Sequence, residues 1–255
     1  MNQPIVVIGM GEMGAVFARG FLRSGFPVYP IIRGMDFSLD PRWPEPFAVV
    51  VAVAEKDLPI TLGMLPESWK GKAVLLQNEL LPPVWLSAGI KDPTVISVWF
   101  EKKKGTEVKA ILPSPVFGPH ADLIARVLGS LAIPCRQLQK YDDLLFALVE
   151  KNVFVLTINI AGLITGGTIA TLWTEHRQLV HNLAEEITAI QESLTNRKFK
   201  LEDLLREMQK AVDSAPEHRC RGRAAPERLA RTLAAAEKAG IDAPVLREIS
   251  AKTAG

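Results

Sequence analysis

A glycine-rich turn directly after an apolar run is the part of the sequence with the clearest chemical meaning. The apolar run at 5–8 is followed by Gly9, Met10, Gly11, Glu12, Met13 and Gly14. In this spacing the first glycine permits a tight strand-to-helix turn, the second lets a pyrophosphate approach the backbone, and the third allows close packing of helix on strand. The phosphates would meet free N–H groups at the helix N-terminus. We therefore expect these six residues to bind a dinucleotide.

The residue at the end of the second expected strand distinguishes NAD from NADP. An acidic residue there binds the ribose 2′-hydroxyl, whereas a basic residue accommodates a 2′-phosphate. Arg33 occupies this position, 24 residues after Gly9, and its rival Asp36 lies beyond the strand end. Arg33 therefore favours NADP (NADPH) as the cofactor, the alternative being that it is a solvated loop charge.

Two polar residues share one face of an apolar helical stretch. Lys151, Val155 and Asn159 are spaced i, i+4 and i+8, so they lie along one stripe of a helix. One interpretation is that the stripe faces a functional site. The other is that Lys151 is a paired or capped lysine at a domain interface.

Composition and charge exclude several other classes of function. Thirty basic and 28 acidic residues give a net charge of +2, which favours neither nucleic acid nor an anionic membrane as a partner. Cys135 and Cys220 have no disulfide or zinc spacing, so we expect no metal and a cytoplasmic protein. The apolar stretch at 144–164 contains charged residues, which favours a buried helix over a membrane span. Arg219, Arg221 and Arg223 are either a clamp for an anionic ligand or a solvated basic loop.

These candidate residues must be positioned by two different kinds of structure. The first half alternates between expected strands and helices, which is typical of a doubly wound parallel sheet with its ligand crevice at the carboxyl ends of the strands. Strands are expected at 27–32, 47–54, 72–77, 94–100 and 105–112, and helices at 15–24 and 121–131. From about residue 141 only helices are expected, at 142–164, 173–196, 201–212 and 226–239.

The predicted fold class is therefore α/β, a Rossmann-type doubly wound parallel sheet followed by an all-helical domain. The expected division is residues 1–140 for NADP binding and 141–255 for substrate binding and dimerisation. No signal-peptide pattern is found at the N-terminus, where the apolar run is explained as the first strand.

Several short motifs together resemble the ketopantoate reductase family over nearly the whole chain. They are the glycine turn at 9–14, Arg33, Gln77-Asn78, Phe117-Gly118-Pro119, Glu150-Lys151-Asn152, Ile158-Asn159 and the closing Gly240-Ile241-Asp242-Ala243-Pro244. The resemblance implies a reductase that uses NADPH to convert a small 2-keto acid to a 2-hydroxy acid, with the chemistry in the cleft between the domains.

The resemblance also assigns roles to individual residues. The family's catalytic lysine falls on Lys151, its helix asparagine on Asn159, and the asparagine of its Asn-Gly loop on Asn78, near the cofactor or the substrate. An ammonium beside the carbonyl oxygen would stabilise the developing alkoxide and then supply the proton. The neutral amides would orient the lysine, the substrate or the nicotinamide ribose.

The chain departs from the family pattern in several places. Val155 replaces a second helix asparagine, Glu79 replaces the glycine of Asn-Gly, and Lys56 matches a further family lysine only loosely. The late glutamate that binds substrate hydroxyls falls near Ala224 by one count and on Glu227 by another. Glu227 is the candidate, its alternative being an ordinary glutamate in the first turn of a helix.

Two other functions remain open at this point. One is a related dehydrogenase acting on 3-hydroxyacids or imines, which also joins a glycine-turn domain to helices. The other is a non-catalytic NADP-binding redox sensor or regulatory protein. Whatever its function, the protein is expected to be able to form a homodimer, since long apolar helices such as the one at 144–164 often pack against a second subunit as well as within one.

Overall fold

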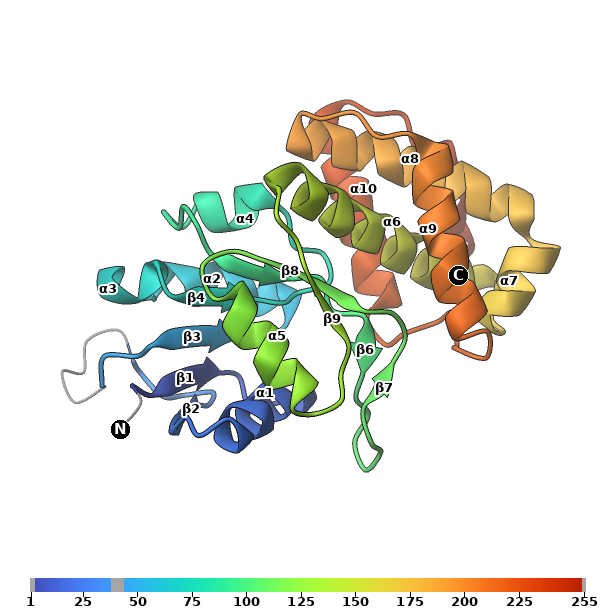
Figure 1. Cartoon of the computed structure of the whole chain (residues 1–255). Coiled ribbons are helices and arrows are strands. Elements are labelled where there is room, and N and C mark those ends of the chain that lie inside the picture. The colour runs from blue at the N-terminus through green and yellow to red at the C-terminus, as the bar shows by residue number, and fades with distance from the viewer. Residues whose placement is uncertain (1–2, 38–43, 254–255) are drawn as a thin grey trace. The chain divides into compact units, whose positions relative to one another are not determined.

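The computed structural model of the chain describes residues 3–37 and 44–253 (Figure 1). The chain divides into two compact units, Met1–Ala147 and Leu148–Gly255. The first unit contains a seven-stranded sheet and a small two-stranded sheet. In the second unit the described residues form helices joined by loops, with one isolated bridge between Thr168 and Arg219.

The main sheet is mostly parallel, with strand order β2-β1-β3-β4-β5-β8-β9. Among the described strands of this sheet, only the β5–β8 pair is antiparallel. The strands are β1 (Ile5–Ile8), β2 (Val28–Ile31), β3 (Ala48–Val51), β4 (Ala73–Leu75), β5 (Thr94–Ile96), β8 (Ser114–Phe117) and β9 (Cys135–Gln137). Strand order reverses at β1, where a doubly wound sheet places its ligand crevice.

Helices cover both faces of this sheet. Helix α1 (Glu12–Arg23) and α5 (Ala121–Gly129) pack with alternate residues of the strands into one apolar core (Figure 1). Strand β3 lies on the other side of β1 from β2, so right-handed crossovers put the helices between β3 and β4 on the opposite face. The remaining elements of this unit are η1 (Glu55–Asp57), α2 (Leu58–Gly63), α3 (Glu67–Lys70), α4 (Pro82–Leu86), β6 (Phe100–Glu101) and β7 (Lys109–Ala110).

The central strands are buried on both faces. Every residue of β1 and β3 is buried, and five of these eight residues are valines. Continuous β-branched runs of this kind suit parallel strands covered by helices on both sides. The predicted α/β fold class is confirmed by this sheet and by the helical region that follows it.

Six helices make up most of the rest of the chain. They are α6 (Tyr141–Thr165), α7 (Ile169–Glu175), α8 (Arg177–Thr195), α9 (Leu201–Ser214), α10 (Ala225–Ala239) and α11 (Pro244–Thr253). Helix α8 is central among them, because it contacts α7, α9, α10 and α11. The buried carboxylate of Glu186 on α8 accepts hydrogen bonds from Val245 N and Leu246 N at 2.7 and 3.0 Å, which caps the start of α11.

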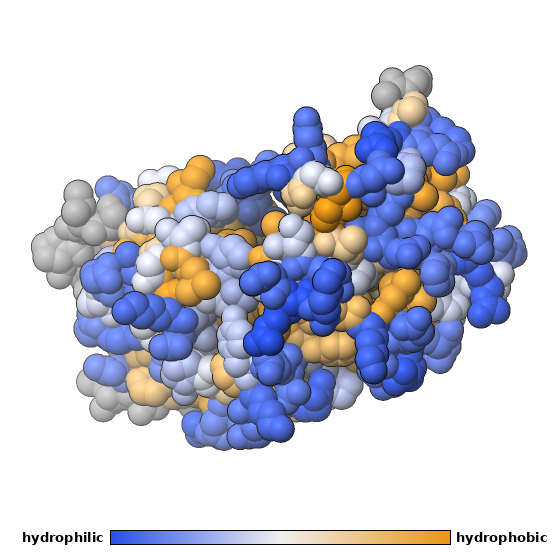
Figure 2. All heavy atoms as spheres, turned by 90° about the horizontal axis from the view of Figure 1, so that it is seen from above, coloured by the Kyte–Doolittle hydropathy of each residue, from blue (hydrophilic) through white to orange (hydrophobic). Residues whose placement is uncertain are grey.

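Helix α6 is the one helix within 3–37 and 44–253 that is long and apolar enough to cross a membrane. Its most apolar 18-residue window is 89% buried inside the protein, as expected for a helix that is apolar on all sides and lies in a core. The face of the molecule in Figure 2 carries hydrophilic residues interspersed with smaller hydrophobic areas. Burial in the protein therefore explains the apolar composition of α6.

Some element boundaries differ from those expected. The strand expected at 94–100 ends at Ile96, since the Trp99 amide donates to Ser114 Oγ instead of continuing the ladder, and β6 pairs with β7. The helix expected at 173–196 is two helices, separated at His176. Strand β8 is not predicted from the sequence, because a proline within a run, here Pro115, argues against a strand.

Candidate functional site

The glycine turn connects β1 to α1 with two glycines that pack against backbone and one that faces open space. Gly9 has φ +92°, and a Cβ there would lie 2.7 Å from Ala52 O. A Cβ on Gly14 would lie 1.9 Å from Gly9 O, whereas a Cβ on Gly11 would have no atom within 4 Å. These three environments are those expected of a turn that leaves its middle glycine accessible to a pyrophosphate.

The N-terminus of α1 opens directly from this turn. Gly11 is the N-cap and has no side chain to cap the first amides, and Met10, Gly11 and Glu12 are exposed. The first N–H groups of a helix lack intrahelical acceptors and attract anions. The residues present therefore fit the pyrophosphate of a dinucleotide.

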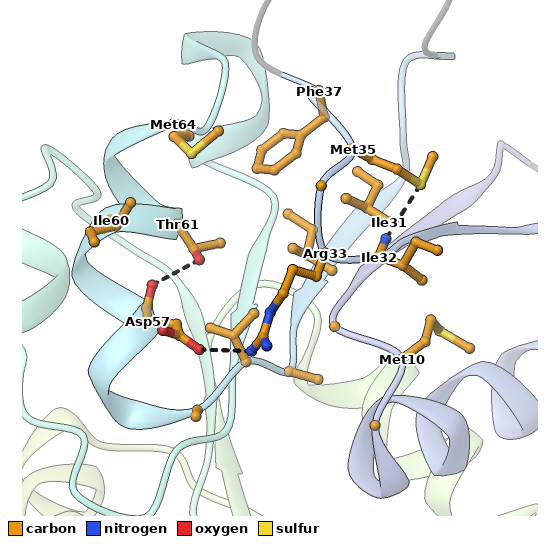
Figure 3. A pocket seen from close by; sticks show the side chains of 17 residues that line it. Met10, Ile31, Ile32, Arg33, Met35, Phe37, Asp57, Ile60, Thr61 and Met64 are labelled. Atoms are coloured by element: carbon orange, nitrogen blue, oxygen red, sulfur yellow. Dashed lines mark hydrogen bonds and ion pairs between the residues drawn. The ribbon is translucent and has the colours of Figure 1, made fainter.

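A cavity of about 640 Å³ begins at the glycine turn and lies along the carboxyl ends of β1, β2 and β3 (Figure 3). Met10, Ile32 and Met35 line it on one side, and Ile60 of α2 and Met64, the residue after this helix, line it on another. All five side chains are apolar and exposed. A cluster of exposed apolar side chains is uncommon on a protein surface except where a ligand or a partner binds. An adenine ring is flat and apolar on both faces, so the cavity suits the adenosine half of a dinucleotide.

Arg33 and Asp57 meet inside this cavity. Arg33 Nη2 lies 3.7 Å from Asp57 Oδ2, and their side chains are 93% and 43% exposed (Figure 3). At this distance and exposure the ion pair is weak, so either group can exchange its partner for a ligand. The guanidinium suits a 2′-phosphate and the carboxylate suits a 2′-hydroxyl. The sequence does not predict Asp57 as a residue of the cofactor site, because Asp57 follows β3 and not the strand that precedes Arg33.

A second ion pair lies beside the helix N-terminus. Glu12 Oε2 is 3.3 Å from Lys102 Nζ, and Lys102 follows β6 directly. This lysine offsets the negative charge that Glu12 places near the expected pyrophosphate. Sequence reasoning does not find Lys102, since 90 residues separate the two partners.

Asn78 lies just beyond β4, at the same sheet edge as the glycine turn. Its backbone N–H donates to Glu55 Oε1 at 3.2 Å. The neighbouring Gln77 is buried, and its Nε2 donates to Val51 O and Val53 O at 2.7 and 3.2 Å. Gln77 thus connects the end of β4 to the end of β3, and one of its acceptors, Val53, lines the cavity.

Lys151 is buried within α6, with 7% of its surface exposed. Burial lowers its pKa from 10.5 to about 7; Glu150 opposes this shift and Arg228 adds to it. Its Nζ also lies 5.9 Å from the centre of the Phe154 ring. A lysine with a pKa near neutrality can both donate and accept a proton at physiological pH, which is the property required of a general acid.

Asn159 lies two turns after Lys151 and is held by Arg228. Arg228 Nη1 donates to Asn159 Oδ1 at 2.7 Å, from the first turn of α10. Val155, between Lys151 and Asn159, is buried with 8% of its surface exposed. The second unit thus brings together Lys151, Asn159 and Arg228, of which only the first two are predicted from the sequence.

Other predicted candidates lie on the surface. Glu227 is exposed in the first turn of α10, where an acidic residue interacts favourably with the helix dipole. Arg219, Arg221 and Arg223 are exposed as well, as expected of a solvated basic loop. Lys56 is exposed in η1.

The chain resembles known proteins in its three-dimensional structure, whereas the comparisons of its sequence found no match. No protein-family model matches the sequence, and no curated protein matches it. Among solved structures, a PanE/ApbA family ketopantoate reductase from Ralstonia eutropha JMP134 is 15% identical, with a TM-score of 0.68 over 98% of this chain and 97% of that one. A dimeric ketopantoate reductase from Staphylococcus aureus is 15% identical, with a TM-score of 0.65 over 96% and 97% of the two chains.

A third solved structure carries a ligand. It is D-mandelate dehydrogenase in a ternary complex with NADH and anilino(oxo)acetate, 10% identical, with a TM-score of 0.69 over 96% of each chain. Identities this low show a shared fold. The resemblance that the sequence motifs predict is therefore confirmed as a resemblance of fold over nearly the whole chain.

Proposed function

We propose that the protein is an NADPH-dependent oxidoreductase that reduces the keto group of a small 2-keto acid. The observation that carries the proposal is the buried Lys151, with a pKa of about 7, in a chain whose first unit has a nucleotide-compatible glycine turn and cavity. The shared fold of solved ketopantoate reductases and D-mandelate dehydrogenase supports the same reaction type. Ketopantoate is the first substrate to test.

The first unit would hold the cofactor. The amides after Gly9 and Gly11 would bind its pyrophosphate, Arg33 its 2′-phosphate, and the cavity along β1, β2 and β3 its adenosine. Asn78 would contact the nicotinamide ribose from the end of β4. When bound, the reduced nicotinamide supplies the hydride.

Lys151 would act on the keto oxygen of the substrate. Its ammonium would polarise the keto oxygen, stabilise the alkoxide that develops on this oxygen, and then protonate it from Nζ. Asn159, fixed by Arg228, would orient the lysine or the substrate through its amide. Because the side chain is buried, it acts in surroundings of low polarity, where a charge stabilises its neighbour more strongly than in water.

The decisive experiment compares turnover with cofactor affinity in one variant. The oxidation of NADPH is followed with ketopantoate and other 2-keto acids, and NADPH binding is measured by its fluorescence. Lys151→Ala is expected to lower kcat by roughly a hundredfold or more while NADPH affinity stays within about twofold of the unmodified protein. Lys210→Ala is the control, since Lys210 is an exposed lysine on α9.

Three outcomes contradict the proposal. Tight NADPH binding without turnover of any 2-keto acid favours a non-catalytic sensor, for which the replacement of an expected asparagine by Val155 is the supporting observation. Turnover that survives Lys151→Ala removes the lysine from the mechanism. A preference for 3-hydroxyacids or imines assigns the chain to a related dehydrogenase.

A further inference from the structure

The exposed methionines of the described chain gather in one place. The sequence contains six methionines, of which five lie within residues 3–37 and 44–253. Met10, Met35 and Met64 all line the cavity beside the glycine turn, and each has between 37% and 39% of its surface exposed (Figure 3). Of the other two, Met13 is partly buried against the core and Met208 is fully buried. Three accessible thioethers therefore share one cavity.

The fold brings these three side chains together from separate segments of the first unit. Met10 lies in the turn after β1, Met35 in the loop after β2, and Met64 directly after α2, which follows β3. The strands β2, β1 and β3 are neighbours in the parallel sheet, so the segments that follow them meet at the same edge. The three sulfur atoms thus border the place where the adenosine of the cofactor is expected.

Met35 is bonded to the loop that carries Arg33. Met35 N donates to Ile32 O at 3.1 Å, and Ile32 N donates to Met35 Sδ at 3.5 Å. The sulfur of a thioether is a weak acceptor, and its oxidation to a sulfoxide converts an apolar side chain into a polar one. A chemical change at Met35 would therefore act on the turn that presents Arg33 to the cavity.

The cavity offers few groups that could satisfy a new polar atom. Among the described residues that line it, Arg33 and Thr61 have the only side-chain hydrogen-bond donors, and Thr61 Oγ1 already donates to Asp57 O at 2.8 Å. A polar oxygen that is buried against an apolar surface without a donor carries a desolvation cost. A sulfoxide pressed against the face of an adenine ring would lose water and gain no such donor from the ring face.

We propose that Met10, Met35 and Met64 form a peroxide-sensitive modification site, whose oxidation weakens NADPH binding and which the bound cofactor shields. The inference rests on the proposed function, because it takes the cavity to hold the adenosine. In the reaction, a sulfur lone pair attacks one oxygen of hydrogen peroxide, an S–O bond forms and the O–O bond breaks. The sulfur is oxidised by two electrons to a sulfoxide, and the peroxide is reduced to water.

The two cysteines compete poorly for the same oxidant. Burial raises the pKa of Cys135 and of Cys220 to about 11, so both remain thiols near neutral pH. The thiolate is the nucleophilic form of cysteine, and a buried thiol in apolar surroundings is inert. The exposed thioethers are therefore the groups in which oxidation is expected to change cofactor binding.

The test treats the full-length protein with hydrogen peroxide, either alone or with saturating NADP⁺, which is not a reductant. Peptide mass spectrometry measures the sulfoxide fraction at each methionine. After removal of the peroxide and of the nucleotide, the Kd for NADPH is measured by its fluorescence. The same treatment is applied to the triple variant Met10→Leu, Met35→Leu, Met64→Leu and to Met208→Leu. The last is the matched control, because Met208 is buried on α9.

The quantity compared is the Kd after peroxide divided by the Kd before it, within each protein. This ratio should be roughly three- to thirtyfold for the unsubstituted protein and for Met208→Leu, and below about twofold for the triple variant. NADP⁺ should lower the sulfoxide fraction at the three cavity methionines several-fold. Methionine sulfoxide reductases should restore the affinity, whereas dithiothreitol, which reduces oxidised cysteines, should not.

Other results overturn the inference in distinguishable ways. An equal rise of the Kd in the triple variant would assign the effect to another residue. Complete oxidation of the three methionines with an unchanged Kd would show that the sulfoxides do not disturb the cofactor. NADP⁺ that binds without protecting these residues would place the adenosine elsewhere. If the unsubstituted protein binds neither NADPH nor NADP⁺ before any treatment, the proposed function itself fails, and this inference fails with it.

Discussion

At the scale of single residues, the three glycines of the turn have different tasks. Gly9 and Gly14 are required by backbone contacts of 2.7 and 1.9 Å that a Cβ would make, whereas Gly11 has open space in front of it. The first two are therefore needed for the fold, and the third is available for the ligand.

This contrast predicts opposite results for two similar substitutions. Gly14→Ala should lower the free energy of unfolding by roughly 1–3 kcal/mol or more, because its Cβ would overlap Gly9 O. Gly11→Ala should cost less than about 1 kcal/mol, as an alanine N-cap does, but weaken NADPH binding by about tenfold or more. Urea unfolding and NADPH fluorescence measure the two effects. If Gly11→Ala binds NADPH normally, the pyrophosphate does not approach this turn.

The choice of cofactor is also decided by single residues. Arg33 and Asp57 face one another at 3.7 Å, and a 2′-phosphate would attract the first and repel the second. Arg33→Gln should raise the Kd for NADPH roughly ten- to a hundredfold with little effect on NADH, and Asp57→Asn should tighten NADPH binding. Titration of each variant with both cofactors tests this. If Arg33→Gln weakens the two cofactors equally, the 2′-phosphate is bound elsewhere.

At the scale of elements, helix α6 determines the protonation of Lys151. The helix is apolar on nearly all sides, so the lysine is desolvated and its pKa falls to about 7. A substrate reduction that needs the ammonium should then be sensitive to pH near neutrality.

We expect kcat for keto-acid reduction to be constant below pH 7 and to fall about tenfold per pH unit above it, because deprotonated Lys151 has no proton to donate. Arg228→Met should move this decline to higher pH, since it removes a neighbouring positive charge that lowers the pKa of Lys151. Rates measured from pH 5.5 to 9.5 test both statements. A decline unaffected by Arg228→Met would assign the titration to another group.

At the scale of the whole molecule, a buried lysine makes stability depend on pH. The unfolded chain keeps the Lys151 proton up to about pH 10.5, whereas the folded chain releases it near pH 7. Between these values the unfolded state binds more protons, so this lysine destabilises the fold most below pH 7 and progressively less as the pH rises.

Lys151→Met should therefore stabilise the protein by roughly 1–4 kcal/mol at pH 6, and the gain should shrink toward pH 10. Urea unfolding of the unmodified protein, Lys151→Met and Lys210→Met at pH 6, 8 and 10 measures the difference. The exposed Lys210 should give no pH-dependent gain. A stabilisation that is equal at all three values would indicate better packing of methionine rather than relief of a buried charge.

The sequence alone determined the features whose signals are local. Valine-rich runs predicted β1 and β3, the glycine spacing predicted the turn before α1, and the apolar stretch at 144–164 predicted α6, because backbone preference and periodicity act over a few residues. The combination of short motifs was sufficient to predict the fold shared with ketopantoate reductases.

Only the tertiary structure decided which distant side chains meet. It paired Arg33 with Asp57, Glu12 with Lys102, and Asn159 with Arg228. It left Glu227 exposed, one residue away from the partly buried hydrogen bond of Arg228. Adjacent positions on a helix point about 100° apart, so a count along the sequence selects the turn but not the residue that faces inward. That direction is set by the packing of Gly162 on the loop before α10, a contact between residues about 60 positions apart that no local pattern encodes.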